Sequence, residues 1–449
     1  PSGGSFLETV KVDLVELDVV VTDDDGNTVL GLTADDFRVT EDGKKVKLTH
    51  FEAVRGTPGT DAVDPTATRP RPAQPGTYMV LLIDNYGIHP ADRQRIVGAV
   101  HEYIERGDFA DAWVAVASYE GYLRMRQTFT RDTALLLEAI AGLEAVSPLG
   151  TALIADRTST FRHGLDTLRS IESLTGLVED DELARRLTSF SRQIAAYAED
   201  LRHQNRTAFQ AIGTLVNALS PLPGRKAVVY VSEGLPMRPG AELQAATEEV
   251  GGGLSEGHDM RSAANREADI DRRSGALDVL SQSAPSPGRR QRGGSSSGGS
   301  RPEGLLELTA MANAYQVSFY TLKPLTEYGG VPAEIGGGAA RVFSPQVQKA
   351  RVRNLAETLE TMASDTGGLA YFATGIDRLL DRAAAELGDH YSLAYPTDHA
   401  GDGRYHEIKV KVRGKKLRVR HRKGYVAKSV EAKIADHTTA SLLLALDDN

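Results

Sequence analysis

Three apolar runs between residues 78 and 232 constrain the fold more than any other feature of this sequence. They are Tyr78-Met-Val-Leu-Leu-Ile-Asp84, Trp113-Val-Ala-Val-Ala-Ser118 and Lys226-Ala-Val-Val-Tyr-Val-Ser232. Each run is apolar along its length rather than at alternate positions, which is typical of strands in a parallel sheet that helices cover on both faces. An amphipathic segment at 92–106 separates the first run from the second, as expected of a strand–helix–strand unit.

Weaker patterns extend the same alternation towards the C-terminus. We predict further strands at 122–129, 317–321 and 369–372, and further helices at 132–143, 301–313, 352–364 and 376–387. The predicted fold class is therefore α/β, with an open, doubly wound, mostly parallel sheet flanked by helices.

The two ends of the chain have a different, alternating pattern. Residues 8–21 alternate charged and apolar side chains, and Asp42-Gly43 stands between two short alternating runs as the turn of a hairpin. Alternation returns in 390–395, 405–412 and 417–420. Because neither end alone has enough strands for a stable sheet, we expect both to combine in one small β-sandwich.

These patterns divide the chain into consecutive parts. We expect the N-terminal part of the sandwich at 1–55, a linker at 56–76, the α/β domain at 77–389, the C-terminal part of the sandwich at 390–428, and a tail or connector at 429–449. Two segments interrupt the α/β domain. Residues 161–205 are charged and helix-prone, which predicts an inserted helical hairpin or an extended helix, and 236–300 have the composition of a disordered loop.

The net charge of −9 excludes nucleic acid as the default partner, because phosphate binding needs a basic surface. The basic stretch Lys409 to Lys423 has apolar residues between its cations, which favours a strand pair with one solvated face. No apolar run approaches the roughly 20 residues that span a bilayer. The absence of cysteine excludes disulfides and thiolate metal sites.

Asp84 and Glu233 are the first candidates for a functional site. In an open α/β sheet, ligands bind beyond the carboxyl ends of the strands, and these two residues follow the first and fourth strands of the α/β domain. The plainer interpretation of Asp84 is a strand-end aspartate that caps nearby backbone amides.

The order of strands and helices resembles that of the von Willebrand factor A-type domain, whose metal-ion-dependent adhesion site uses an Asp-x-Ser-x-Ser loop, a distant Thr, and an Asp after the fourth strand. Asp84 matches the first ligand, Thr151 in the Pro148-to-Ala152 segment matches the Thr, and Glu233 stands in place of the last Asp. Tyr86 and Ile88 replace the two serines, and Ile88 offers no oxygen to a hard cation. The adhesion site is therefore degenerate.

A narrower resemblance is to the von Willebrand factor A-related proteins abundant in acidobacteria. It rests on motifs in a shared order over most of 8–428, namely VTDDDG, GLTADDF and TEDG between Val21 and Gly43, then LIDN, Phe129-Thr-Arg-Asp132, Thr366-Gly-Gly368, Tyr391 to Tyr395 and His421-Arg-Lys-Gly-Tyr425. This resemblance implies an exported, extracytoplasmic protein that binds other proteins or cell-surface polymers.

Enzyme signatures are missing from the sequence. It contains no His-Glu-x-x-His motif, no phosphate-binding loop, and no Gly-x-Ser-x-Gly elbow between a predicted strand and a predicted helix. Four C-terminal histidines fit no standard metal spacing and are interpreted as strand-surface residues, namely His390, His399, His406 and His421.

Three functional hypotheses follow. The first is a non-enzymatic interaction or adhesion module that needs no metal; its partner contacts the face carrying Asp84, Asn85, Tyr86, His89, Thr151 and Glu233. Tyr86 and His89 are its expected anchors, because aromatic residues are enriched at binding hot spots. The alternative is metal-dependent adhesion or a hydrolase-like function, with Mg²⁺, Mn²⁺ or Ca²⁺ bound by Asp84, Thr151 and Glu233. A third interpretation places binding in the helical insertion.

Overall fold

A six-stranded sheet forms the centre of the α/β part of the chain. The computed structural model describes residues 14–55, 77–107, 112–144, 180–222, 224–245, 301–302, 304–324, 345–373, 375–399, 401–414 and 416–427, with short helical pieces between 159 and 173. The predicted linker at 56–76, Thr151 and the predicted tail at 429–449 lie outside these residues.

The sheet has the strand order β10-β9-β8-β5-β6-β7. Neighbouring strands are parallel except β6 and β7, which form an antiparallel pair at one edge. Its strands are β5 (Tyr78–Asp84), β6 (Trp113–Tyr119), β7 (Leu123–Thr130), β8 (Lys226–Val231), β9 (Val317–Pro324) and β10 (Ala370–Ala373). The prediction of a mixed α/β fold with a mostly parallel sheet flanked by helices is confirmed.

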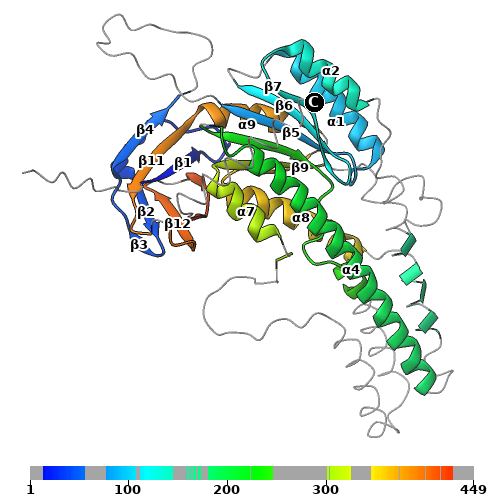
Figure 1. Cartoon of the computed structure of the whole chain (residues 1–449). Coiled ribbons are helices and arrows are strands. Elements are labelled where there is room, and N and C mark those ends of the chain that lie inside the picture. Colours follow the sequence, from blue (N-terminus) through cyan, green and yellow to red (C-terminus); the bar gives the residue numbers. More distant parts are fainter. Residues whose placement is uncertain are drawn as a thin grey trace, which may run out of the picture.

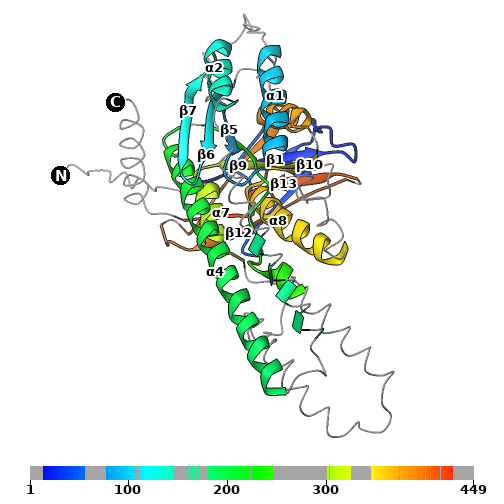
Figure 2. The same ribbon diagram turned by 90° about the vertical axis from the view of Figure 1, so that its right-hand side faces the viewer.

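Successive residues of β5 pack against helices on opposite faces of this sheet (Figures 1 and 2). Leu81 and Ile83 belong to the apolar core formed with one set of helices: α1 (Pro90–Arg106), α2 (Thr133–Glu144) and α9 (Asp377–Gly388). Val80 and Leu82 belong to the core formed with the other: α4 (Asp180–Ala218), α7 (Leu305–Ala314) and α8 (Pro345–Thr366). Two buried faces explain why the strands are apolar throughout.

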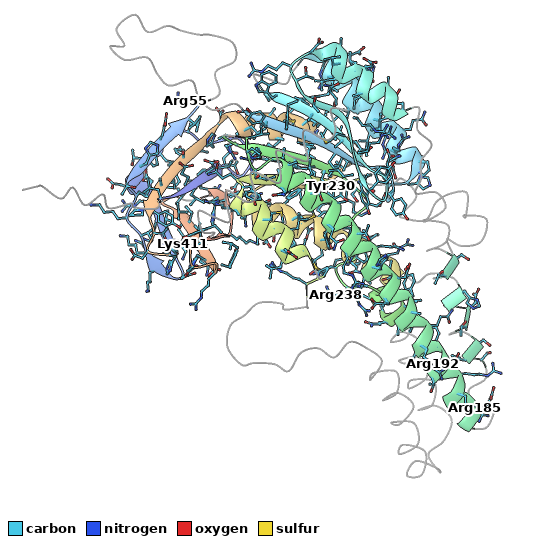
Figure 3. The ribbon with its side chains drawn as sticks, viewed as in Figure 1. Arg55, Arg185, Arg192, Tyr230, Arg238 and Lys411 are labelled. Carbon is cyan, nitrogen blue, oxygen red and sulfur yellow. The ribbon has the colours of Figure 1, made fainter. Side chains whose placement is uncertain are left out.

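The predicted helical insertion does not end at residue 205. Helix α4 runs for 39 residues, and Phe209 and Ile212 on its C-terminal part pack into the sheet core. Its N-terminal part, with Arg185 and Arg192, extends well beyond the sheet (Figure 3). The predicted end at residue 205 was wrong because the helical sequence pattern continues without interruption from the insertion into the part that packs on the sheet.

The predicted loop at 236–300 was also placed too early. Residues 236–245 are described, and Met237 and Leu243 are buried there. The amide of Met237 donates to the carbonyl of Asn354 at 3.0 Å, which fixes this segment against α8. Its proline- and glycine-containing sequence concealed these contacts, while residues 246–300 lie outside the described part of the chain.

Strands from the two ends of the chain combine in two further sheets. The sheets have the orders β13-β1-β11-β4 and β14-β12-β2-β3, and side chains from both contribute to one apolar core. Their elements are β1 (Leu14–Thr22), the 3₁₀ helix η1 (Ala34–Asp36), β2 (Phe37–Glu41), β3 (Lys44–Lys45), β4 (His50–Val54), β11 (His390–Pro396), β12 (Tyr405–Val412), β13 (Arg418–His421) and β14 (Gly424–Val426). We call this part the β unit.

The predicted strand pair in the basic stretch is wrong. Lys409 and Lys411 are exposed on β12 between buried residues, as the alternation predicted, but β12 pairs with β2 and β14. Strand β13 pairs with β1 in the other sheet. Alternation specifies which face of a strand is buried, but it does not specify the neighbouring strand.

A buried carboxylate joins the β unit to the α/β part. Glu386 on α9 is fully buried and forms ion pairs with Arg382 on its own helix and with Arg420 on β13. The hydroxyl of Tyr320 also donates to Glu386 at 3.0 Å. Among the described residues no helix is both long and apolar enough to cross a membrane.

Candidate functional site

The carboxylate of Asp84 connects the ends of two parallel strands. Its Oδ1 accepts hydrogen bonds from the amides of Tyr86 at 3.1 Å and Gly87 at 2.7 Å, and its Oδ2 accepts one from the Ser232 hydroxyl at 2.6 Å. The Tyr230 hydroxyl donates to Oδ2 at 3.3 Å. Asp84 is only 2% exposed, so its charge is stabilised by these donors rather than by bulk water. It caps backbone amides, as the plainer interpretation expected.

Tyr230 lies in the middle of the sheet region (Figure 3). Complete burial is the main cause that raises its pKa well above the ordinary value, and the neighbouring Asp84 carboxylate adds to the increase. Tyr230 therefore stays neutral and keeps its proton as a donor to Asp84.

The loop after Asp84 is held by close packing. A Cβ atom at Gly87 would lie 2.7 Å from Asp84 Oδ2, so only glycine lets the backbone approach the carboxylate this closely. The Tyr86 ring packs edge-on against Tyr119 with ring centroids 5.9 Å apart, and Ile88 is fully buried in the core beneath α1. Apolar packing thus occupies the two positions where the resemblance places serine ligands.

Glu233 already has a cationic partner within the protein. The Lys323 ammonium lies 2.5 Å from Glu233 Oε2 and donates to the Glu233 backbone carbonyl at 3.0 Å. Lys323 comes from the carboxyl end of β9 and is only 5% exposed. Burial of Lys323 makes the pair a fixed part of the structure, because removing Glu233 would leave an uncompensated buried ammonium.

Asp92 is a further charged residue near the carboxyl ends of the strands, and the sequence did not reveal it as a candidate. It lies in the first turn of α1, is buried, and pairs through Oδ1 with Arg95 at 2.5 Å. Burial is the main cause that raises its pKa, and the charge of Glu233 is the second, while the charges of Arg95, His89 and Lys323 oppose the increase. The Glu233 carboxylate therefore acts electrostatically on Asp92, and we group the two residues together. Its position at the start of the helix after the first strand was the available signal.

Asn85 is fully buried, and neither its Oδ1 nor its Nδ2 has a hydrogen-bond partner among the described residues. His89 is the N-cap of α1, and its Nδ1 accepts a hydrogen bond from the amide of Ala91 at 3.3 Å. Tyr86, His89 and Glu233 are partly exposed. We call the group of Asp84, Asn85, Tyr86, His89, Asp92, Glu233 and Lys323 the strand-end face. Thr151 lies outside the described residues, so its place beside this face stays a prediction.

The interpretation of the C-terminal histidines as strand-surface residues is wrong for two of the four. His390 and His406 are buried. Burial and then the charge of Arg225 lower the pKa of His390, which keeps that imidazole neutral. His399 and His406 stack face to face with ring centroids 4.0 Å apart. His406 also contacts the carboxylate of Asp42, which comes from the other end of the chain. Sequence spacing could not show that these residues come together.

Comparisons with known proteins show limited similarity. No family model and no curated protein matches the chain. Among solved structures it matches an aspartate-to-alanine mutant of the PilB minor pilin from Streptococcus sanguinis, at 11% identity and a TM-score of 0.28, over 72% of this chain and 62% of that one.

Two further matches come from the type V pili tip protein Mfa5 of Porphyromonas gingivalis. Its three N-terminal domains match at 11% identity and a TM-score of 0.27, over 82% of this chain and 54% of that one. Its vWF domain alone matches at 12% identity and a TM-score of 0.28, over 69% of this chain and 94% of that one. Because TM-scores this low do not establish a shared fold, the fold described above rests on the strand pairing alone.

Proposed function

We propose that this chain is a non-enzymatic, exported protein-interaction or adhesion module of the von Willebrand factor A type, and that its strand-end face works without a metal ion. The partner is a protein or a cell-surface polymer, and the protein acts outside the cytoplasm. The resemblance of the sequence motifs supports the family and the location. The geometry of the strand-end face supports metal independence.

The ion pair between Lys323 and Glu233 is the observation that carries this proposal. An adhesion site of this type needs carboxylates that are free to bind a divalent cation, but here the ammonium of Lys323 lies against Glu233 Oε2. A cation bound at Glu233 would lie beside the buried ammonium of Lys323, and the repulsion between the two positive charges makes binding there costly. Asp84 is likewise engaged with amides and hydroxyls.

The partner contacts are assigned to the partly exposed members of the strand-end face. Asp84 and Asn85 are buried, so we assign them the role of shaping the loop, whereas Tyr86, His89 and Glu233 remain available to a partner. An aromatic ring already fixed by packing loses little conformational freedom on binding, which favours Tyr86 as the main anchor.

Thermal unfolding distinguishes the metal-independent proposal from a divalent cation bound by Asp84, Thr151 and Glu233. The protein is melted in EDTA and then with Mg²⁺, Mn²⁺ or Ca²⁺, alongside Asp84→Ala. A cation that binds only the folded state at about 100 times its Kd adds about 2.7 kcal/mol, so a metal-bound site would produce a clear rise in Tm that is lost in Asp84→Ala. We expect no such rise in either protein.

A binding assay tests the interaction itself. Fluorescently labelled protein is titrated onto intact cells of the producing strain in EDTA, and Tyr86→Ala is expected to weaken binding by about 30-fold or more, the effect of a hot-spot residue. Trp113→Ala is the matched control, because Trp113 is a partly exposed aromatic residue at the start of β6, away from the carboxyl ends of the strands. Equal binding by wild type and Tyr86→Ala would refute the assignment of this face.

A further inference from the structure

Two histidines and two carboxylates converge at one end of the β unit. His406 Nδ1 lies 2.8 Å from Asp42 Oδ2, and His406 Nε2 lies 3.1 Å from Asp402 Oδ2. His399 Nδ1 lies 3.7 Å from the same Asp402 oxygen. Potential ligand atoms of Asp42, His399 and His406 all lie within 4.8 Å of one another. Imidazole and carboxylate atoms this close can share one bound ion.

The backbone holds these side chains in place before any ligand binds. Asp42 occupies the turn between β2 and β3 with a positive φ of 48°, and its Oδ1 accepts a hydrogen bond from the amide of Glu407 at 2.9 Å. Asp402 Oδ1 accepts one from the amide of Arg404 at 2.8 Å. His406 lies on β12 and is only 4% exposed. The two carboxylates are therefore fixed on opposite sides of one buried imidazole ring.

We propose that His399, Asp402 and His406 bind a transition-metal ion of the Zn²⁺ type, with Asp42 orienting the ring of His406. A ligating histidine commonly hydrogen-bonds through its second nitrogen to a carboxylate, which fixes the tautomer, and the contact of His406 Nδ1 with Asp42 supplies this arrangement. His406 Nε2 then faces Asp402 as a ligand atom. Two imidazoles favour Zn²⁺, Co²⁺, Ni²⁺ or Cu²⁺ over the hard cations Mg²⁺ and Ca²⁺.

An ion can reach this site from solvent. The side chain of His399 is 37% exposed and that of Asp402 is 31% exposed, whereas the His406 ring forms the buried floor. Three protein ligands leave the fourth coordination position of a tetrahedral ion open for water or for a ligand from a partner. Structural zinc sites, by contrast, usually have four protein ligands. This site shares no residue with the strand-end face, so the two proposals can fail independently.

Metal titration of tag-free protein tests the site. The protein is stripped with EDTA and desalted, and Zn²⁺ is titrated by calorimetry while Co²⁺ is titrated by visible absorption. We expect one saturable site per chain and a Co²⁺ spectrum of low-coordinate geometry. Asp42→Asn, which keeps a residue that tolerates positive φ, is expected to weaken binding by about 10–100-fold. His399→Ala removes a ligand and should weaken binding further.

His50→Ala is the control, because His50 is an exposed histidine on β4 of the same unit. It should bind Zn²⁺ as wild type does. Because His399 is partly exposed, His399→Ala should keep the far-ultraviolet circular dichroism of wild type. Absence of saturable Zn²⁺ binding to wild type, or equal binding by folded His399→Ala, would overturn the proposal.

Discussion

The strand-end role of Asp84 can be tested by comparing two substitutions at that position. Asp84→Ala removes both acceptor oxygens and leaves the amides of Tyr86 and Gly87 without this partner. These amides are fixed by the loop, and each buried donor left unsatisfied costs about 1–3 kcal/mol. The expected loss of unfolding free energy is therefore about 2–6 kcal/mol, before any contribution from the Ser232 and Tyr230 hydroxyls, which can rotate.

Asp84→Asn should cost much less. The amide oxygen of Asn can accept from the two backbone amides, and its NH₂ can donate to the hydroxyl oxygens of Ser232 and Tyr230, so the loss is that of charge assistance, about 1–2 kcal/mol. Urea unfolding of wild type and both variants, with the m-value checked for constancy, measures the difference. If Asn were as destabilising as Ala, the negative charge itself would be required. That result would refute the capping role and point to a cation beside Asp84.

Two buried charges give further predictions. Lys226 is buried, and desolvation lowers its pKa from 10.5 to about 8, so Lys226→Met should raise the free energy of unfolding by up to about 3 kcal/mol at pH 7. Because the folded pKa is lower than the unfolded one, this gain should be full below pH 8 and should fade as the pH rises towards 10.5. A gain that does not depend on pH in urea unfolding would contradict the reasoning. Glu386→Gln leaves the guanidinium groups of Arg382 and Arg420 without their shared counter-charge and should lower the free energy of unfolding by about 3–5 kcal/mol in the same assay. Glu360→Gln, at an exposed position on α8, is its control. A loss equal to that of the control would show that the two ion pairs of Glu386 contribute nothing to stability.

The parallel sheet was predictable because its strands are buried on both faces and are therefore apolar at every position. The turn at Asp42-Gly43 was predictable for a local reason, since both residues adopt the positive φ that this dipeptide tolerates. The glycine pair after α8 likewise follows a local rule, since a glycine with positive φ commonly ends a helix and Gly367 has a φ of 80° there.

The ion pair of the strand-end face was not predicted from the sequence. Lys323 is the penultimate residue of a mostly buried strand, and a lysine in that position requires a counter-charge, but the sequence does not identify Glu233 as its partner. The contact between Asp42 and His406 spans 364 positions in the chain. Pairing across such distances is decided by how strands from the two ends assemble, and alternation alone does not encode it.

The interleaving of β1 between β11 and β13 has a consequence for synthesis of the protein. Strand β1 leaves the ribosome early, yet both of its neighbours in the sheet follow residue 389. During translation its apolar side chains and most of its backbone edges lack their native partners, and such edges attract other chains. A truncated chain would keep this edge exposed and be marked for degradation or aggregation. The two sheets of the β unit can therefore be completed only after residue 426 has been translated. A folded β unit thus implies that the whole α/β part has already been synthesised.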